Sequence, residues 1–429
     1  MERIEVRKKG SLRGEVILPG DKSISHRAVI IGSLAKGEVK VKGLSLGEDN
    51  QRTIAAFKQM GVDIKVKGKS GLTIRGKGLF ALKEPTQMID AGNSGTTMRL
   101  LTGLLSGQRF FSVISGDNSL NQRPMRRIIE PLSKMNAQIW GRGGGDFAPL
   151  AISGRSLKAI KYRLPVASAQ VKSAIILAGL YAQGVTEVEE PSFTRDHTER
   201  MLAYFGAGLE REGNSIRIRG GMEWEGRGVI VAGDISSAAF LIVAATIIPN
   251  SKITIRGVGI NATRTGFLEI LKKMGAAIEI TNQEEVSGEP VADIVVRSGR
   301  LKGTEIRGKI IPSLIDEIPI LSIAASLAEG ETVIRDASEL RVKETDRIKA
   351  IVSELRKFGV KIEEYEDGIV IAGGTKMKGT HCQSFGDHRM AMSLIVAGLA
   401  SQGETVVHDT ACIRTSFPQF METLTSMMN

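Results

Sequence analysis

The strongest constraint on the fold is a pattern of residues that recurs six times along the chain. Each copy has an apolar helix, a Gly or other small residue, a short β-type run, a polar loop, an amphipathic helix and a strand opened in most copies by Met-Gly or Phe-Gly. The apolar helices are expected in AVIIGSLAK, SGTTMRLLTGLLS, SAQVKSAIILAGLYAQ, SSAAFLIVAATII, IPILSIAASLAE and RMAMSLIVAGLAS. These segments are apolar almost all round, which predicts that they are buried. A period of roughly 70 to 80 residues is too long for a simple solenoid.

The length of the chain, 429 residues, is too great for one compact core. Three copies in each of two domains is the natural division, with the boundary near Gly233, where the fourth copy begins. The short N-terminal segment could pair with either half. We assign residues 21–232 to a first three-repeat domain, and residues 1–20 with 233–429 to a second, discontinuous one. The predicted class is α/β, with repeated units of the βαβαββ type.

Composition narrows the class of protein further. With 42% hydrophobic but only 4% aromatic residues, and with 49 glycines, the interiors should be aliphatic and the turns numerous, which favours α/β over an aromatic-rich β-sandwich. No apolar run reaches about 18 residues, and the N-terminus lacks the apolar region of a signal peptide. Cys382 and Cys412 are too few for a disulfide framework. A cytoplasmic protein with no membrane partner is therefore expected.

The chain is basic, with a formal net charge of +11 and a pI of about 9.6. This charge is compatible with nucleic acid, an acidic surface or small anionic substrates. The basic residues are scattered, no Lys/Arg tail is present, and few aromatic residues could stack on bases. We therefore expect no nucleic-acid partner and favour small anionic substrates.

The segment Leu18–Ala28, LPGDKSISHRA, places polar side chains at the expected start of a helix, just after a Pro-Gly turn. The first N–H groups of a helix lack intrahelical partners and attract anions. Ser23 can cap the helix or donate to a ligand, and Lys22 and Arg27 add positive charge. Ser23 and Arg27 also share one helical face. An ordinary Ser cap with two solvated cations is the alternative.

Two later segments repeat this chemistry. Asp90–Arg99, DAGNSGTTMR, exposes backbone at Gly95 before an apolar helix, with several side-chain donors beside it. In Leu120–Arg127, LNQRPMRR, Pro124 holds the preceding residue extended at a helix start. Arg123 should then point outward from a rigid corner, where its fork suits a phosphate or carboxylate. An ordinary capped turn and a solvated Arg cluster are the alternatives.

Two segments near the middle of the chain add further polar groups. Ser168–Ala174, SAQVKSA, opens a nearly uncharged helix in which Gln170 is polar where burial is expected. Thr194–Arg200, TRDHTER, brings Arg195 and His197 to the junction of a loop and a helix. A plain helix cap and a solvent-exposed ion network are the alternatives. His197 has no second His or Cys at a ligand spacing, so no metal site is predicted.

A carboxylate suited to proton transfer is expected in Ser313–Pro319, SLIDEIP. Asp316 and Glu317 interrupt an apolar stretch there. Partial desolvation would raise the pKa of such a carboxylate and suit it to proton transfer. Helix capping by Asp316 is the alternative.

Two more charged groups follow in the second half of the chain. RVKETDR places Lys343 and Arg347 four residues apart on one helical face, with Glu344 beside them. FGDHRMAMS places Arg389 at the start of a very apolar helix, where a charged side chain needs an anion. Plain surface charge is the alternative for both segments.

Taken together and in order, these segments resemble the 5-enolpyruvylshikimate-3-phosphate synthases. The resemblance rests on LPGDKSISHRA, GNSGTTMRLL, NQRPMRR, SAQVKSA, TRDHTER, LIDEIP, KETDR and GDHRMAMS, which span the chain. SAQ and TRDHTER are closer to the class II than to the class I branch. The resemblance implies the inside-out α/β architecture of the enolpyruvyl transferase fold, with two domains that close over the substrates. It also implies that no metal or organic cofactor is needed, and we expect a monomer.

The resemblance implies a reaction between two anionic substrates. The 5-hydroxyl of shikimate-3-phosphate adds to C2 of phosphoenolpyruvate while C3 is protonated. The tetrahedral intermediate then loses phosphate and a C3 proton. Asp316 would be the base, Glu344 an acid–base partner, and Lys22 a third catalytic group. Preorganised Arg and Lys would offset the repulsion between the substrates and stabilise charge in the transition state.

The same resemblance implies two sets of binding residues. Those for shikimate-3-phosphate are Lys22, Ser23, Arg27, Ser168, Ala169, Gln170, Arg195, Asp316 and Lys343. Those for phosphoenolpyruvate are Lys22, Gly95, Arg123, Gln170, Arg347 and Arg389. Lys22 and Gln170 would thus serve both substrates.

Some positions depart from the class I pattern. CIRTSFPQF has Thr415 where class I has a Lys, and Arg414, one residue earlier, is the candidate replacement. Arg195 is expected to do the work of an aromatic hydroxyl of class I. In this family a Gly at the position of Gly95 is associated with sensitivity to glyphosate, so competition by glyphosate is expected.

Two other functions remain as alternatives. The sister enolpyruvyl transferase that acts on UDP-N-acetylglucosamine shares the architecture, but LPGDKSISHRA and KETDR argue against it. A basic nucleic-acid-binding scaffold is the non-enzymatic alternative, and strong, salt-dependent retention of RNA would favour it. Release of phosphate from shikimate-3-phosphate and phosphoenolpyruvate separates all three.

Overall fold

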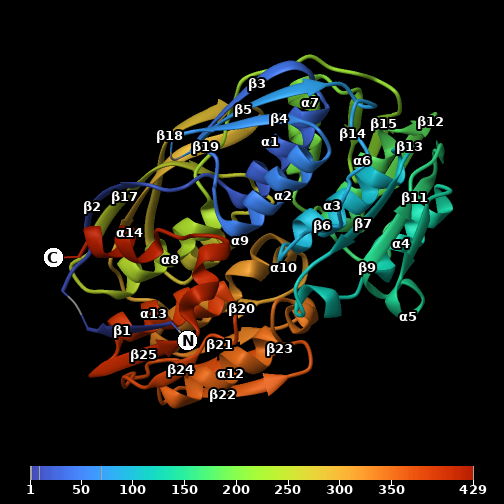
Figure 1. Cartoon of the computed structure of the whole chain (residues 1–429). Helices are drawn as coiled ribbons and strands as arrows, with labels where there is room; N and C mark the ends of the chain where they lie inside the picture. Colours follow the sequence, from blue (N-terminus) through green and yellow to red (C-terminus); the bar gives the residue numbers. More distant parts are fainter. Residues whose placement is uncertain (1, 9, 69, 429) are drawn as a thin grey trace. The chain divides into compact units, whose positions relative to one another are not determined.

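The computed structural model describes residues 2–8, 10–68 and 70–428, and the chain divides into two compact units (Figure 1). Unit 1 contains Met1–Pro19, Gly233–Glu284 and Pro290–Asn429, and unit 2 contains Gly20–Ala232 and Glu285–Glu289. Each unit buries its own cluster of apolar side chains, and the two clusters share no residue. Each unit therefore has a hydrophobic core of its own.

Unit 2 begins with the first of its buried helices and contains three four-stranded sheets. Its helices are α1 (Lys22–Leu34), α2 (Glu48–Gln59), α3 (Gly95–Ser106), α4 (Arg126–Lys134), α5 (Arg142–Gly145), α6 (Ala169–Gly179) and α7 (His197–Phe205). Its strands are β3 (Lys36–Lys42), β4 (Asp63–Lys67), β5 (Gly71–Lys77), β6 (Ile89–Asp90), β7 (Phe111–Ser115), β8 (Gln138–Gly141), β9 (Phe147–Ser153), β10 (Leu157–Lys158), β11 (Lys161–Arg163), β12 (Ala182–Gln183), β13 (Val185–Glu189), β14 (Leu209–Glu212), β15 (Ser215–Arg219) and β16 (Val229–Ile230).

Unit 1 combines the N-terminal strands with the second half of the chain. Its helices are α8 (Ile235–Ile247), α9 (Gly266–Lys273), α10 (Ile311–Leu314), α11 (Ile318–Leu327), α12 (Arg347–Lys357), α13 (His388–Ala400) and α14 (Phe420–Ser426). Its strands are β1 (Arg3–Arg7), β2 (Arg13–Ile17), β17 (Lys252–Gly259), β18 (Ala277–Val286), β19 (Glu289–Arg297), β20 (Glu305–Ile306), β21 (Glu331–Ile334), β22 (Lys361–Tyr365), β23 (Gly368–Ala372), β24 (His381–Gln383) and β25 (Glu404–His408). The tip of the β18–β19 hairpin, Glu285–Glu289, groups with unit 2.

The sheets repeat one strand order, as the recurring sequence pattern predicts. In unit 2 the orders are β16-β3-β5-β4, β6-β7-β9-β8 and β11-β13-β15-β14, and in unit 1 they are β18-β19-β17-β2, β20-β21-β23-β22 and β1-β25-β24. Each sheet has a parallel pair of strands followed by an antiparallel pair, for example β16 with β3 and then β3 with β5. The last sheet is completed by the first strand of the chain, because β1 pairs with β25.

The helices that were predicted to be buried lie at the centre of each unit. They are α1, α3 and α6 in unit 2, and α8, α11 and α13 in unit 1. Several of their hydroxyl groups donate to the carbonyl oxygen four residues earlier, as Thr102 does to Met98 at 2.7 Å and Ser322 to Ile318 at 2.8 Å. These bonds satisfy polar groups that have no access to water.

The sheets cover the buried helices from outside. On β3, for example, Val39 and Val41 are buried and the residues between them are exposed. Gly103 on α3 lets two buried helices approach closely, because a Cβ atom there would lie 2.2 Å from the carbonyl oxygen of Ala174 on α6. Each unit therefore has helices inside and sheets outside.

The amphipathic helices end where the sequence pattern places its Met-Gly and Phe-Gly pairs. Gly206 after α7 and Gly275 after α9 have φ angles of 81° and 100°. A residue with a Cβ rarely adopts this left-handed conformation, which terminates a helix. In the second copy the position is taken by Asn136, with φ of 75°, the non-glycine residue that tolerates this region best.

One long helical run in unit 1 has the average composition of a membrane span. By length and average composition alone, the helical run Gly308–Leu327 could cross a membrane, although Asp316 and Glu317 interrupt its apolar residues, so it contains no uninterrupted apolar run of about 18 residues. In the structure, 67% of its apolar window is buried, and its α11 part is one of the central helices of unit 1. A buried core helix needs the same composition as a membrane span.

Candidate active site

The start of α1 in unit 2 is capped by Asp21, whose side chain accepts a hydrogen bond from the backbone N–H of Ile24 at 2.9 Å. Asp21 rather than Ser23 caps the helix, so the alternative of an ordinary Ser cap is wrong, and donation to a ligand remains the predicted role of Ser23. Lys22 Nζ lies 3.0 Å from Oδ2 of Asp49, which is in the first turn of α2. Lys22 and Ser23, the first two residues of α1, therefore lie at a helix N-terminus.

Arg27 is a buried cation with neutral hydrogen-bond acceptors. Its Nε donates to Thr198 Oγ1 at 2.7 Å, Nη2 to Ser173 Oγ at 3.0 Å, and Nη1 to the carbonyl oxygen of Ser23 at 2.9 Å. Burial lowers the pKa of Arg27 to about 10, so the side chain is still charged at neutral pH. A buried charge needs an opposite charge to stabilise it. The charge of Glu199, followed by those of Asp21 and Glu289, stabilises this cation, whose direct hydrogen-bond acceptors are neutral oxygens.

The start of α3 brings together two arginines and an amide. Ser94 caps the helix, and Arg123 Nη2 donates to Asn93 Oδ1 at 2.6 Å. Arg123 was expected to point outward, but it is buried, because this bond draws it toward the α3 turn. Arg99, in the second turn of α3, donates through Nη1 to Oε1 of Gln170.

Gly95 is the first residue of α3 and leaves little room beside these arginines. A Cβ atom at Gly95 would lie 3.1 Å from Arg99 Nη1 and 3.4 Å from Arg123 Nη1. The backbone N–H groups of a helix start and two guanidinium groups therefore converge at this glycine. Such an arrangement suits a small anion.

The start of α6 and the loop before α7 complete the cationic part of unit 2. Ser168 caps α6, with Oγ accepting from the backbone N–H of Val171 at 3.5 Å, and Ala169 and Gln170 open the helix. Gln170 Nε2 donates to Thr96 Oγ1 at 3.3 Å. The positive charge of Arg195 contributes to lowering the pKa of Arg27, so the two cations lie near each other.

In unit 1, Arg347 lies at the start of α12 and is surrounded by carboxylates. Nε is 2.7 Å from Asp387 Oδ2, Nη2 is 2.7 Å from Glu344 Oε2, and Nη1 is 3.2 Å from Asp316 Oδ1. Burial by itself would lower the pKa of Arg347, but Asp387, Glu344 and Asp316 raise it above its ordinary value. Arg347 therefore holds three acidic groups in one place.

Asp316 lies between two cations. Its Oδ1 is 3.2 Å from both Lys343 Nζ and Arg347 Nη1, and its side chain is 12% exposed. Both contacts are made to the same oxygen, so the carboxyl group of Asp316 is held by two basic side chains. Asp316 lies in a short 3-10 segment, and no side-chain cap is made at the start of α11. The two contacts therefore fix the orientation of the Asp316 side chain.

Arg389, at the start of α13, lies beside this group. Its Nη1 donates to the carbonyl oxygen of Asp316 at 3.0 Å and to Oε1 of Glu317 at 3.1 Å. Asp387 caps α13, accepting from the backbone N–H of Arg389 at 2.8 Å. The three motifs singled out in the second half of the sequence therefore meet within unit 1.

Comparison with known proteins identifies the family. The family model of EPSP synthase (3-phosphoshikimate 1-carboxyvinyltransferase) matches residues 6–424. The chain belongs to the EPSP synthase family. Relatives named 3-phosphoshikimate 1-carboxyvinyltransferase include those of Geotalea uraniireducens and Geobacter metallireducens, each 57% identical over 424 residues, with 99% of either chain covered. The resemblance read from the motifs is confirmed.

Solved structures agree with this family and its fold. A structure of EPSP synthase from Acinetobacter baumannii is 45% identical, with a TM-score of 0.90 over 100% of this chain and 98% of that one. The enolpyruvyl transferase NikO from Streptomyces tendae is 17% identical, with a TM-score of 0.80 over 99% and 97% of the chains, which shows likeness of fold alone. The chain thus has the enolpyruvyl transferase fold.

Three residues of this EPSP synthase family member were not singled out for a role by the sequence. They are Asp49, which pairs with Lys22, Arg99, which binds Gln170, and Asp387, which binds Arg347. A signal was present for Arg99 and Asp387, because each is a charged residue in or beside an apolar helix. Such a residue is rarely buried without a partner.

Arg414, considered as a replacement for the class I Lys, lies at the surface. Its Nη1 is 2.7 Å from Oε1 of Glu2, and its side chain is 51% exposed. The contacts that join Asp316, Glu344 and Asp387 are made by Lys343 and Arg347 instead.

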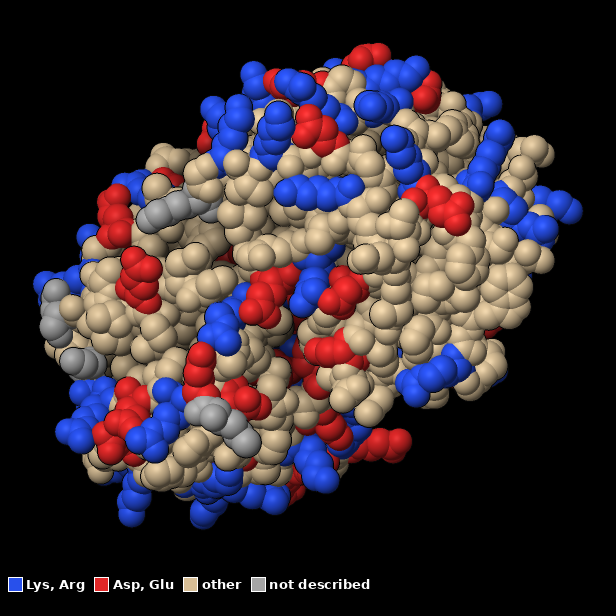
Figure 2. Space-filling model, in the orientation of Figure 1, with Lys and Arg blue, Asp and Glu red and all other residues tan. Residues whose placement is uncertain are grey.

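Charge and possible metal ligands can also be placed. On the face shown in Figure 2, Lys and Arg side chains are interspersed with Asp and Glu rather than gathered into one basic stripe. Within residues 2–8, 10–68 and 70–428, no group of three or more His, Cys, Asp or Glu side chains is arranged to hold a metal ion. His197 Nδ1 lies 2.7 Å from Oε1 of Glu289, at the hairpin tip that groups with unit 2.

Proposed function

We propose that this chain transfers the enolpyruvyl group of phosphoenolpyruvate to the 5-hydroxyl of shikimate-3-phosphate and releases phosphate. One observation carries the proposal: the family match spans residues 6–424 and so includes every residue assigned to either substrate. The geometry supports it, because those residues lie at helix starts and in clusters of buried cations and carboxylates. Both substrates are polyanions, for which such groups are suited.

In unit 2, shikimate-3-phosphate is bound by Lys22, Ser23 and Arg27 of α1, by Ser168, Ala169 and Gln170 at the start of α6, and by Arg195. A phosphate or carboxylate oxygen of the substrate would give Arg27 the anionic partner that Thr198 and Ser173 do not supply. Phosphoenolpyruvate is bound by Gly95, Arg123, Gln170 and Lys22. In these assignments, the positively charged side chains already lie in position before the substrate binds.

In unit 1, the carboxylates of Asp316 and Glu344 take part in the proton transfers. Asp316 takes the proton of the 5-hydroxyl as the hydroxyl oxygen forms a bond to C2 and C3 is protonated, and Glu344 is an acid–base partner. Lys343 contacts shikimate-3-phosphate, while Arg347 and Arg389 stabilise phosphoenolpyruvate. The tetrahedral intermediate collapses when the C2–O bond to phosphate breaks and C3 loses a proton. Groups fixed by ion pairs need little reorganisation during these steps.

The proposal is tested by mixing the protein with shikimate-3-phosphate and phosphoenolpyruvate and measuring inorganic phosphate. Phosphate release that needs both substrates is expected. Release with UDP-N-acetylglucosamine in place of shikimate-3-phosphate would favour the sister transferase. Salt-dependent RNA binding without any release would favour the nucleic-acid scaffold.

We also propose that the enzyme acts as a monomer in the cytoplasm, without a metal or organic cofactor and without membrane or nucleic-acid partners. The free thiols of Cys382 and Cys412 support a reducing compartment. Burial raises the pKa of each thiol to about 12, so neither is a reactive thiolate at neutral pH. Light scattering on a size-exclusion column tests the monomer, and a mass twice that of the chain would contradict it.

Replacement of Arg27 by Met should weaken binding of shikimate-3-phosphate by about 100-fold, or about 2.7 kcal/mol. The variant should fold, because Ser173 and Thr198 already contact each other at 2.7 Å and remain satisfied without Arg27. Calorimetric titration with shikimate-3-phosphate measures the loss. The exposed Arg75→Met variant is the control, and equal affinities of the two variants would exclude Arg27 from the site.

Glyphosate should inhibit the enzyme in competition with phosphoenolpyruvate, and Gly95→Ala should relieve this inhibition. The added methyl group would crowd Arg99 and Arg123 at 3.1 and 3.4 Å. We expect the KM for phosphoenolpyruvate to rise roughly tenfold, or about 1.4 kcal/mol, and the Ki for glyphosate to rise more. Steady-state kinetics at several inhibitor concentrations measure both. Unchanged wild-type activity at millimolar glyphosate would refute the prediction.

A further inference from the structure

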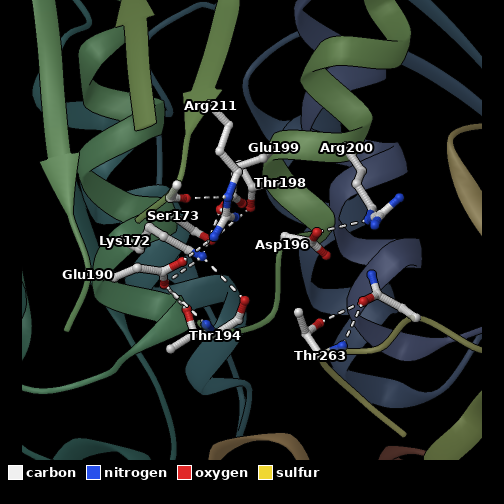
Figure 3. A network of polar contacts seen from close by, with 12 residues as sticks. Lys172, Ser173, Glu190, Thr194, Asp196, Thr198, Glu199, Arg200, Arg211 and Thr263 are labelled. Carbon is white, nitrogen blue, oxygen red and sulfur yellow. Dashed lines mark hydrogen bonds and ion pairs between the residues drawn. The ribbon is translucent and has the colours of Figure 1, made fainter. Parts of the chain in front are cut away.

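Unit 2 contains a buried group of four charged side chains to which no role in the reaction is assigned. We call Lys172, Glu190, Glu199 and Arg211 the Lys172 cluster (Figure 3). Lys172 Nζ lies 2.9 Å from Glu190 Oε2 and 2.7 Å from Glu199 Oε1, and all three side chains are almost fully buried. Arg211 contacts the same two carboxylates, at 2.6 Å from Glu190 Oε1 and 3.5 Å from Glu199 Oε1. Two cations thus share two anions.

Stability alone does not explain this cluster. Lys172 is a charged residue inside α6, an otherwise apolar helix. Buried ion pairs commonly add little to the free energy of unfolding compared with apolar side chains of similar volume. Ion pairs are directional, whereas apolar contacts are not, so ion pairs can fix the orientation of the backbone segments that they join.

The cluster holds the loop that leads to Arg195. Glu190 Oε2 accepts hydrogen bonds from the backbone N–H of Thr194 at 3.2 Å and from Thr194 Oγ1 at 2.7 Å. Lys172 Nζ donates to the carbonyl oxygen of Thr194 at 3.4 Å. Three polar groups of the residue next to Arg195 are therefore bound to the cluster.

Arg211 holds the same loop at a second point. Its guanidinium group lies over the ring of Phe193, 4.9 Å from the centroid. Phe193 is 57% exposed, so the rest of its environment does little to fix it. Stacking of a guanidinium on an aromatic face is favourable and directional. The two residues before Arg195 are thus both tied to the Lys172 cluster.

The cluster also adjoins the groups that hold Arg27. Ser173 follows Lys172 on α6, and Thr198 precedes Glu199 on α7, and these two hydroxyl groups accept from Arg27. The negative charge of Glu199 is the largest of the charge effects that stabilise the cationic form of Arg27. With both cations in place the cluster is neutral. Without one of them, a carboxylate would compete with a substrate anion for Arg27.

We propose that the Lys172 cluster is a positioning device for shikimate-3-phosphate: it fixes the loop before α7 so that Arg195, together with Arg27, is presented to the anionic groups of that substrate. The inference rests on the proposed function. Its members act through Arg195 and Arg27 and do not touch the substrate. A defect in the cluster should therefore change the affinity for shikimate-3-phosphate and leave phosphoenolpyruvate unaffected.

The test uses Arg211, the most exposed member of the cluster, so that the variant folds. Arg211→Met should raise the KM and Kd for shikimate-3-phosphate by about tenfold, with kcat and the KM for phosphoenolpyruvate within about twofold of wild type. Arg211→Lys restores the charge and should recover part of the lost affinity. Arg217→Met, on the neighbouring strand β15 and outside the cluster, is the matched control and should bind like wild type.

A double-variant cycle separates positioning from a general structural effect. If Arg211 acts through Arg195 and Arg27, Arg211→Met should raise the Kd by a smaller factor in an Arg195→Met background than in the wild type, because only the route through Arg27 remains. Three outcomes would each overturn the inference. The effects of the two substitutions on the Kd could be simply additive, the affinity of Arg211→Met could be unchanged, or the KM values for the two substrates could rise equally. If Arg211→Met does not fold, Phe193→Ala removes only the stacked ring and should raise the Kd by roughly threefold; wild-type affinity in that variant would overturn the inference equally.

The two proposals fail in different ways. A wild-type protein that releases no phosphate from the two substrates overturns the proposed function and this inference with it. An active wild type whose Arg211→Met variant binds shikimate-3-phosphate normally overturns the inference alone.

Discussion

Asp316→Asn is expected to lower kcat by about three orders of magnitude, the typical range for removal of a general base being roughly 10²- to 10⁴-fold. Asn has the size of Asp and can still accept hydrogen bonds from Lys343 and Arg347, which contact Oδ1 at 3.2 Å. It cannot take the proton of the 5-hydroxyl. Affinity for shikimate-3-phosphate should therefore fall much less than kcat. A stopped assay of phosphate release measures kcat, and calorimetric titration measures the affinity.

The control is the exposed Asp63→Asn variant, which makes the same chemical change on β4. It should keep wild-type kcat. A kcat for Asp316→Asn within a few-fold of the control would remove Asp316 from the role of base. Equal losses of kcat and binding would instead make Asp316 a binding residue.

Arg347→Met should cost about 3–5 kcal/mol of the free energy of unfolding of unit 1, the range seen when one partner of a buried ion pair is removed. Three carboxylates, those of Asp316, Glu344 and Asp387, lose the cation that now holds them together. Urea unfolding followed by circular dichroism measures the change. Arg356→Met is the matched control, because Arg356 is an exposed residue of the same helix that donates to the carbonyl oxygen of Ile362.

The same variant should show an altered dependence of stability on pH. Without Arg347, the three neighbouring carboxylates repel one another in the folded state, and protonation relieves that repulsion. The folded variant then binds more protons than the unfolded one, so its stability increases as the pH falls from 7 toward about 5. The difference between variant and wild type should therefore narrow in acid. A difference that is constant with pH would show that lost packing, rather than uncompensated charge, is the cause.

The repeat and the buried helices could be predicted because they depend on local patterns. A helix such as α8 is apolar on every side, which leaves burial as its only stable environment. The ends of the amphipathic helices could also be predicted from the sequence, since Gly206 and Gly275 adopt a conformation that few other residues tolerate. The cap of α1 was missed by two positions, because Asp21 and Ser23 are both good caps.

Partners that are distant in the sequence could not be predicted. Arg99 and Gln170 are 71 residues apart, and Arg347 and Asp387 are 40 apart. The outward direction predicted for Arg123 was wrong for the same reason, since its partner Asn93 lies 30 residues away. The orientation of Asp316 likewise depends on Lys343 and Arg347, which the local sequence around Asp316 does not contain.

The tip of the β18–β19 hairpin is a further feature without a local signal. Glu289 pairs with His197, and Arg200 Nη1 donates to the carbonyl oxygen of Gly288 at 3.2 Å. A polar hairpin tip normally indicates a solvated turn. The sequence therefore gave no reason to group Glu285–Glu289 with unit 2.

The pairing of β1 with β25 has a consequence for biosynthesis. The residues Arg7 and Glu404, which pair across these strands, are 397 positions apart. Gly20–Ala232, nearly all of unit 2, leaves the ribosome long before β25 has been made, so this part of the chain can fold while translation continues. The last sheet of unit 1 must instead wait for the end of synthesis, with β1 lacking its native neighbour until then. Until then the edge of β1 exposes unpaired backbone N–H and C=O groups, and a chaperone that covers this edge would prevent pairing with other chains.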